Sequence, residues 1–244
     1  MTSTATELWQ WFAHTDAGLA LRIILGGSIL ATFGIADLRR NGRHATRWRE
    51  YSFLLLAVLV ALIYGVANDQ ITCRLSWEYF YYGKELSPVL GDRIPPDYGK
   101  LSWEATKVGL KATWTVGLLV GVFILLANNP RPGRPSLSYA SLLKRMPVIV
   151  ASAILCALLL GWIGSVGGLK ILSEDFRQMV LHDEFRPYTF MMVYGIHLGG
   201  YIGGALGTVA AIVSILRERS QAREPRSHDD AKFSRRKFNA ADLH

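Results

Sequence analysis

The stretch YGIHLGGYIGGALG, residues 194–207, lies inside the last long apolar segment of the chain. Glycines recur in it every four residues, and a second glycine row lies beside the first. The two rows are Gly195, Gly199, Gly203 and Gly207, and Gly200 and Gly204. Residues four apart share one face of a helix. Because lipid provides little hydrophobic drive between helices, small residues that let backbones approach supply the packing. The stretch predicts the central helix of a membrane bundle, packed through a glycine zipper.

Two other segments carry glycines that could meet this helix. Gly117 and Gly121 lie in the third apolar segment, and Gly161, Gly164 and Gly168 lie in the fourth. Both sets are expected to pack against the glycine rows of residues 194–207. The spacing does not distinguish packing within the chain from dimerisation or a pore.

His197 is the only acidic, basic or imidazole side chain between Arg186 and Arg217. At about 100° per residue it lies apart from the first glycine row, on the side of Tyr201. Burying an ionisable group at membrane depth costs about 2–3 kcal/mol or more unless it has a partner. His197 is therefore either a functional residue or a neutral imidazole held by the Tyr201 hydroxyl.

The composition is that of a membrane protein. Half of the 244 residues are hydrophobic, and the mean hydropathy is +0.21. The net charge of +8 is carried by basic residues between the apolar segments, where they determine topology. No specific nucleic-acid partner is therefore expected. Cys73 and Cys156 lie far apart without CxxC spacing, which argues against a disulfide framework or a zinc ribbon.

Five apolar segments approach the ~20 residues that a helix needs to cross a bilayer. They cover about residues 19–36, 51–67, 106–127, 148–168 and 190–216. Such uniformly apolar segments cannot be barrel strands, which alternate, so the fold class is an all-α integral membrane helical bundle. An interfacial segment is expected at 1–18, and a basic, disordered cytoplasmic tail at 217–244.

The connections alternate in charge along the chain. Residues 37–50 contain five arginines, residues 128–147 contain four basic residues and no acid, and the tail is basic. The positive-inside rule then places the N-terminus outside and the C-terminus inside. The two connections on the outer side hold most of the acids.

Each outer connection is expected to contain an interfacial helix. The sequence LSWE occurs at 75–78 and again at 101–104, and in both a Ser cap precedes an acid. These signals predict a short helix from Trp77 and a third span that begins at Trp103. Residues 173–187 predict the second interfacial helix, ended by Pro187. Glu78 is open to two interpretations: a ligand or proton acceptor, or a helix-start carboxylate paired with Arg74.

A metal site is a further hypothesis. The run His182-Asp183-Glu184 contains three ligand types, but adjacent helical residues cannot point to one centre. At most two of them could serve, and a solvated interfacial helix is the alternative. In the metal hypothesis, Glu78, His182 or Asp183 joins His197 to bind a transition metal or relay protons at the outer end of the bundle.

The segment ITCRLSWEYF, residues 71–80, resembles a motif of small bacterial multi-pass membrane proteins of unknown function, IT-x-R-x-S-x-EYF. Trp77 stands where that motif has proline. Those proteins are similar again in a late helix, where here His197 precedes Tyr201-Ile202-Gly203-Gly204. The resemblance implies that Arg74, Glu78, His197 and Tyr201 form one site. It also implies a bacterial cytoplasmic (inner) membrane as the location.

Nucleotide-binding, metalloprotease, hydrolase and haem-attachment motifs do not occur in the sequence. Packing glycines and lipid anchors therefore favour an accessory or scaffold subunit of a membrane complex over an enzyme. Its expected partners are the bilayer and either other membrane subunits or a second copy. One alternative is a membrane enzyme or a metal- or proton-binding protein with an outward site around Glu78 and His197. Another is a channel or transporter.

Overall fold

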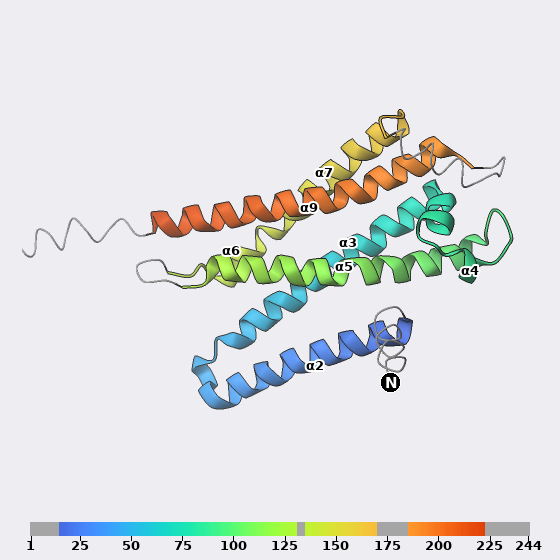
Figure 1. The fold of residues 1–244 in the computed structure, drawn as a ribbon. Helices are drawn as coiled ribbons and strands as arrows, with labels where there is room; N and C mark the ends of the chain where they lie inside the picture. The colour runs from blue at the N-terminus through green and yellow to red at the C-terminus, as the bar shows by residue number, and fades with distance from the viewer. Residues whose placement is uncertain (1–14, 131–134, 170–184, 223–244) are drawn as a thin grey trace, which may run out of the picture.

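The structure, a computed structural model, describes residues 15–130, 135–169 and 185–222, and within them the secondary structure is helical, with no strands. Five helical segments are long and apolar enough to cross a membrane (Figure 1). They are α2 (Asp16–Asn41), α3 (Arg47–Leu75), α5 (Tyr98–Asn128), α6 with α7 (Tyr139–Leu143 and Met146–Ser165) and α9 (Pro187–Gln221). The predicted helical bundle with five candidate spans is confirmed.

Some predictions concern residues that lie partly or mostly outside these described ranges. The N-terminal segment lies mostly outside the described residues, and so does the predicted helix at 173–187. The tail was predicted to be disordered from 217, but α9 continues to Gln221 and residues 217–221 are helical. Residues 223–244 of the tail lie outside the described residues.

The third span begins earlier than the prediction of Trp103. The N-cap of α5 is Asp97, whose carboxylate accepts a hydrogen bond from the backbone N–H of Lys100 at 2.9 Å. Ser102 lies inside the helix, where its hydroxyl donates to Oε1 of Gln70 on α3 at 2.5 Å. The Ser-Trp-Glu signal was wrong as a helix start because a carboxylate cap lies one turn upstream and Ser102 bonds between helices instead.

The helices form two tightly packed pairs, the first of which is α3 with α5. A Cβ atom on Gly117 would lie 2.7 Å from Cα of Val58, and one on Gly109 would lie 2.9 Å from the carbonyl oxygen of Gly65. Gly121 likewise faces Leu54 of α3. The glycines of α5 therefore pack against α3, and the expectation that they face α9 was wrong.

The second pair is α7 with α9. A Cβ atom would lie 2.2 Å from the carbonyl oxygen of Leu160 if built on Gly195, and 2.3 Å from that of Cys156 if built on Gly199. Gly203 meets the carbonyl oxygen of Ser152 in the same way. These distances allow no side chain, so the first glycine row places the two backbones in direct contact within one chain.

Aromatic residues join the two pairs at one end of the bundle, which we call the η2 end. After α3 the chain enters the π-helix η2 (Tyr79–Gly83) and the short α4 (Ser87–Leu90). The rings do not lie on the surface, because Trp77, Tyr79 and Phe80 are buried in a common core with Phe190 and Met191 of α9. This core fixes the start of α9 against the end of α3.

Arg219 joins the two pairs at the opposite end. Its guanidinium is buried and donates to the backbone carbonyl groups of Ala127, Asn129 (2.7 Å) and Pro135 (3.0 Å). The carbonyl groups of Ala127 and Asn129 lie at the C-terminus of α5, where a helix leaves acceptors without an intrahelical donor, and that of Pro135 lies in the connection to α6. Arg219 of α9 thus caps α5, which belongs to the other helix pair.

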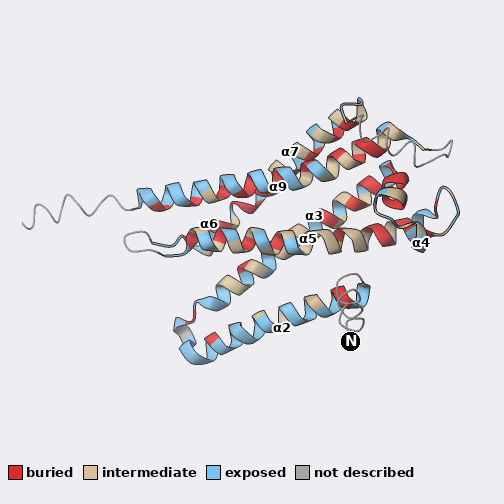
Figure 2. Ribbon diagram, viewed as in Figure 1, coloured by how far each residue is buried: buried red, intermediate tan, exposed pale blue. Residues whose placement is uncertain are grey.

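Helix α2 is packed less extensively than the other spans. Its buried residues are Gly18, Leu19, Gly34 and Asp37. Ion pairs from Asp16 to Lys107 (2.9 Å) and Lys111 (2.5 Å) tie its first turn to α5. The 3-10 turn η1 (Gly42–His44) ties its other end to α3. Figure 2 shows that most of its length is exposed outside the bundle.

Candidate functional site

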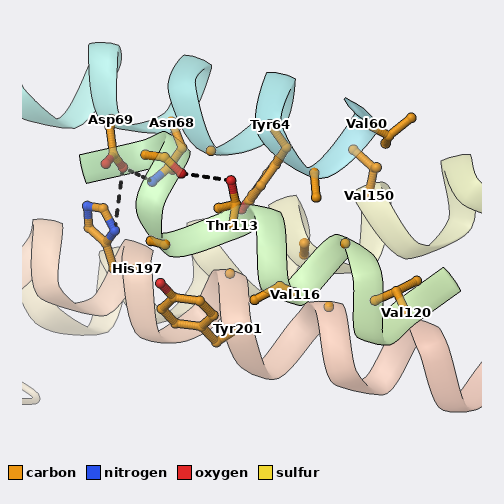
Figure 3. Close-up of a pocket in the computed structure, with 18 of the residues that line it drawn as sticks. Val60, Tyr64, Asn68, Asp69, Thr113, Val116, Val120, Val150, His197 and Tyr201 are labelled. Atoms are coloured by element: carbon orange, nitrogen blue, oxygen red, sulfur yellow. Dashed lines mark hydrogen bonds and ion pairs between the residues drawn. The ribbon is translucent and has the colours of Figure 1, made fainter. Parts of the chain in front are cut away.

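A groove lies between the two helix pairs, lined by residues of α3, α5, α7 and α9. Its cavity volume is about 90 Å³, and about 860 Å³ of non-atom space lies in the groove together with its open side. Small apolar residues form most of its walls, among them Val60, Val116 and Val150 (Figure 3), with Ala61 and Gly204. The groove therefore has the lining of a site for an apolar molecule, and its open side leaves room for one to enter.

Polar groups gather where the groove approaches the η2 end. Tyr64, Asn68 and Asp69 come from α3, and His197 and Tyr201 come from α9. Residues 64 and 68, and residues 197 and 201, are each four apart and so lie on one helix face. Lys84, just after η2, completes the set. The groove is thus amphipathic along its length.

Asp69 and His197 point toward one another across the groove (Figure 3). Their side chains are only 5% and 9% exposed, and Oδ1 of Asp69 lies 3.7 Å from Nδ1 of His197. The Nδ2 amide group of Asn68 also donates to Oδ1 at 3.3 Å. A buried carboxyl group at this depth therefore has an imidazole as its nearest basic partner.

The neighbouring hydrogen bonds favour one tautomer of this imidazole. The Thr72 hydroxyl donates its single hydrogen to the carbonyl oxygen of Asn68 at 2.8 Å. Its oxygen also lies 3.3 Å from Nε2 of His197, and the tautomer that fits this contact carries its proton on Nε2. Nδ1 then faces Asp69 at 3.7 Å, an ion-pair distance that is too long for a hydrogen bond. A net charge is costly at this depth, and the pair is neutral as a whole when it carries one proton between the carboxyl group and Nδ1.

Aromatic rings of η2 pack against His197 at this end of the groove. The ring of Tyr79 stacks on the imidazole of His197, with ring centroids 4.8 Å apart, and Phe80 meets the imidazole edge-on at 6.0 Å. Burial raises the pKa of the Tyr79 hydroxyl. The hydroxyl therefore stays neutral, and the wall around His197 carries no charge from η2.

Lys84 is the half-buried cation of the groove. Its Nζ atom lies 5.4 Å from the centroid of the Tyr79 ring, a cation–π distance. Burial lowers the pKa of Lys84. Within the described residues, no carboxylate lies within 4.0 Å of the ammonium group.

The four residues of the predicted site separate into different surroundings. Arg74 is exposed and donates to the carbonyl oxygen and to Oε1 of Gln70. Glu78 is fully buried, but it accepts hydrogen bonds from Ser76 (2.7 Å) and from Nε of Arg186 (2.9 Å). The predicted pairing of Glu78 with Arg74 was wrong, because α3 ends at Leu75 and the helical spacing between them is lost.

His197 and Tyr201 do line one groove, but they are not joined by the predicted hydrogen bond. The described partner of the imidazole is Thr72, and Tyr201 is 45% exposed beside the groove. No group of three or more metal-ligating side chains occurs in the part of the chain that the structure describes. His182 and Asp183 lie outside that part.

Sequence reasoning missed Asp69, Thr72 and Lys84. Asp69 was treated as the polar end of the second span, which was predicted to end at residue 67. The helix continues to Leu75, and Asp69 follows the close-packed Gly65 by one turn on the same face. The four-residue spacing from Gly65 to Asp69 was the sequence signal that could have placed Asp69 on the packed face of the helix. Nothing local in the sequence indicates that Lys84 returns to the groove.

Comparisons with protein-family models, with curated proteins and with solved structures find no match. The function must therefore be argued from the groove and its side chains. Their arrangement can hold an apolar body between the helix pairs and a polar group beside Asp69, His197 and Lys84.

Proposed function

We propose that this multi-pass membrane protein binds a small amphipathic lipid in the groove between its two helix pairs. The observation that carries the proposal is the distribution of polarity along the groove. Apolar side chains line most of it, and Asp69, His197 and Lys84 gather at one end. A largely apolar pocket with a few convergent polar groups is the usual form of a small-molecule site.

The dimensions support a ligand held within the membrane. Ala57 and Asp69 both line the groove, and at ~1.5 Å per residue they are roughly 18 Å apart along α3. This is more than half of the ~30 Å hydrocarbon core of a bilayer. An acyl or isoprenoid chain from one leaflet fits that length. With the orientation favoured by the basic connections, the polar end belongs to the outer leaflet.

The groove walls also support the proposal. Protein interiors are normally packed as densely as organic crystals. Here a Cβ atom built on Gly204 would meet nothing within 4 Å, although Gly203 beside it would collide with α7. Small residues at the groove thus leave space that the pairs do not use for packing each other.

The test is to fill the groove from Gly204. The full chain, purified in a mild detergent, is expected to retain a lipid-like molecule that native mass spectrometry detects. Gly204→Leu should reduce its occupancy about tenfold or more, because the new side chain occupies the ligand's space. Gly26→Leu is the matched control, since Gly26 is an exposed helical glycine with nothing within 4 Å of its Cβ position. Absence of a bound molecule from the wild type, or equal occupancy in all three proteins, would refute the proposal.

An accessory or scaffold subunit is the second candidate, and helix α2 is the observation that favours it. Four of its 26 residues are buried, and Ile24 is 63% exposed. A photo-crosslinker at Ile24 should join the chain to another membrane subunit or a second copy at a fixed stoichiometry. Leu155, 66% exposed on α7, is the control position. Equal, non-stoichiometric cross-linking from both positions would argue against this role.

A further inference from the structure

The charge balance at the polar end of the groove defines the ligand further. With one proton between them, Asp69 and His197 are neutral together, and this is the state that burial at membrane depth favours. Tyr79 is a neutral phenol stacked on the imidazole. Lys84 adds one positive charge with no carboxylate of the described residues within 4.0 Å. The polar end therefore carries about one uncompensated positive charge.

The other groove-lining groups do not alter this balance. Tyr64 of α3 and Tyr201 of α9 present neutral hydroxyl groups. The groove residues of α5 and α7 include no acidic or basic side chain. Lys84 has three N–H donors, and each tyrosine has one. Donors thus exceed acceptors where the head group of a ligand would lie.

We propose that the groove binds a long-chain carboxylate, with Lys84 as the counter-ion of its head group. This deepens the proposed function and rests on it. A carboxylate is acceptor-only and carries one negative charge, which complements one ammonium group and the tyrosine hydroxyls. A phosphate monoester carries about −1.5 to −2 at neutral pH and would overcompensate one lysine.

The test compares ligands that share one chain and differ in head group. Delipidated full-length protein in phosphatidylcholine nanodiscs is titrated with hexadecanoate, hexadecanol and hexadecyl phosphate. Hexadecanoate should bind about tenfold more tightly than hexadecanol, the effect of one charge-assisted contact. Lys84→Met should abolish this preference, so that hexadecanoate binds no more tightly than hexadecanol. Lys84→Arg should keep the preference, and so should Lys100→Met, the control at an exposed lysine.

The outcomes separate the two proposals. Equal affinity for hexadecanoate and hexadecanol in the wild type overturns the role of Lys84 but leaves amphiphile binding standing. If Lys84→Met still binds hexadecanoate more tightly than hexadecanol, the role of Lys84 is likewise overturned and amphiphile binding stands. Hexadecyl phosphate binding as tightly as hexadecanoate, or more tightly, overturns the assignment of a carboxylate. Binding of no probe to the wild type overturns the proposed function as well.

Discussion

Asp69 and His197 show how one proton can make two ionisable residues tolerable inside a membrane. Separate charges at this depth would cost several kcal/mol, and an isolated neutral acid would lack an acceptor for its proton. Thr72 fixes the imidazole so that Nδ1 faces the carboxyl group. A single proton on either residue therefore leaves the pair without a net charge.

This arrangement predicts unequal effects of two substitutions. His197→Leu removes the partner of Asp69 and should lower the free energy of unfolding by about 2–3 kcal/mol. Asp69→Asn should cost less than ~1 kcal/mol, because the amide N–H can donate to Nδ1 without a shared proton. Unfolding in mixed micelles with increasing SDS measures both. Asp92→Asn, at an exposed loop position, is the control. A loss in Asp69→Asn equal to that in His197→Leu would contradict the shared proton.

The glycines of α9 divide into two kinds at the level of the helix. Gly199 and its row face α7, where carbonyl oxygens occupy the space of a side chain. Gly204 faces the groove, where that space is empty. One helix thus supplies a packing face and a cavity face, and the same residue type serves opposite purposes on them.

Alanine substitutions should separate the two faces. Gly199→Ala places a methyl group 2.3 Å from the carbonyl oxygen of Cys156, and overpacking of this kind costs about 1–3 kcal/mol. Gly204→Ala should be neutral or stabilise by up to about 1 kcal/mol, from helix propensity alone. Thermal unfolding of the two purified variants decides between these effects. Equal stability of the variants would show that α7 and α9 separate at little cost.

The molecule as a whole consists of two helix pairs that are joined at both ends and separated between them. Aromatic side chains join the pairs at the η2 end, and a buried core of Phe53, Ile124, Leu142 and Ile215 joins them at the other end with Arg219. This construction keeps a groove open in the middle without detaching the pairs. With the orientation favoured by the basic connections, a ligand would enter from the outer leaflet.

That orientation can be measured with single cysteines. In a background with Cys73 and Cys156 replaced by serine, Asp92→Cys marks the η2 end and Ser136→Cys marks the other; both positions are exposed. A membrane-impermeant maleimide should label Asp92→Cys in intact spheroplasts. It should label Ser136→Cys only after permeabilisation, because the positive-inside rule predicts that the basic connections stay inside. The reverse pattern would place the polar end of the groove on the cytoplasmic side.

The amino-acid sequence alone determined the number and type of the spans. In lipid, each long apolar segment must satisfy its own backbone hydrogen bonds, so composition and length suffice to predict a helix. The glycine row of α9 likewise predicted close helix approach, because only glycine permits backbone contact. Only the tertiary structure decided that the α5 glycines meet α3, and that Asp69, Lys84 and His197 meet at one groove. Thr72 and His197 are 125 residues apart, and such contacts depend on how whole helices pair, which no local pattern specifies.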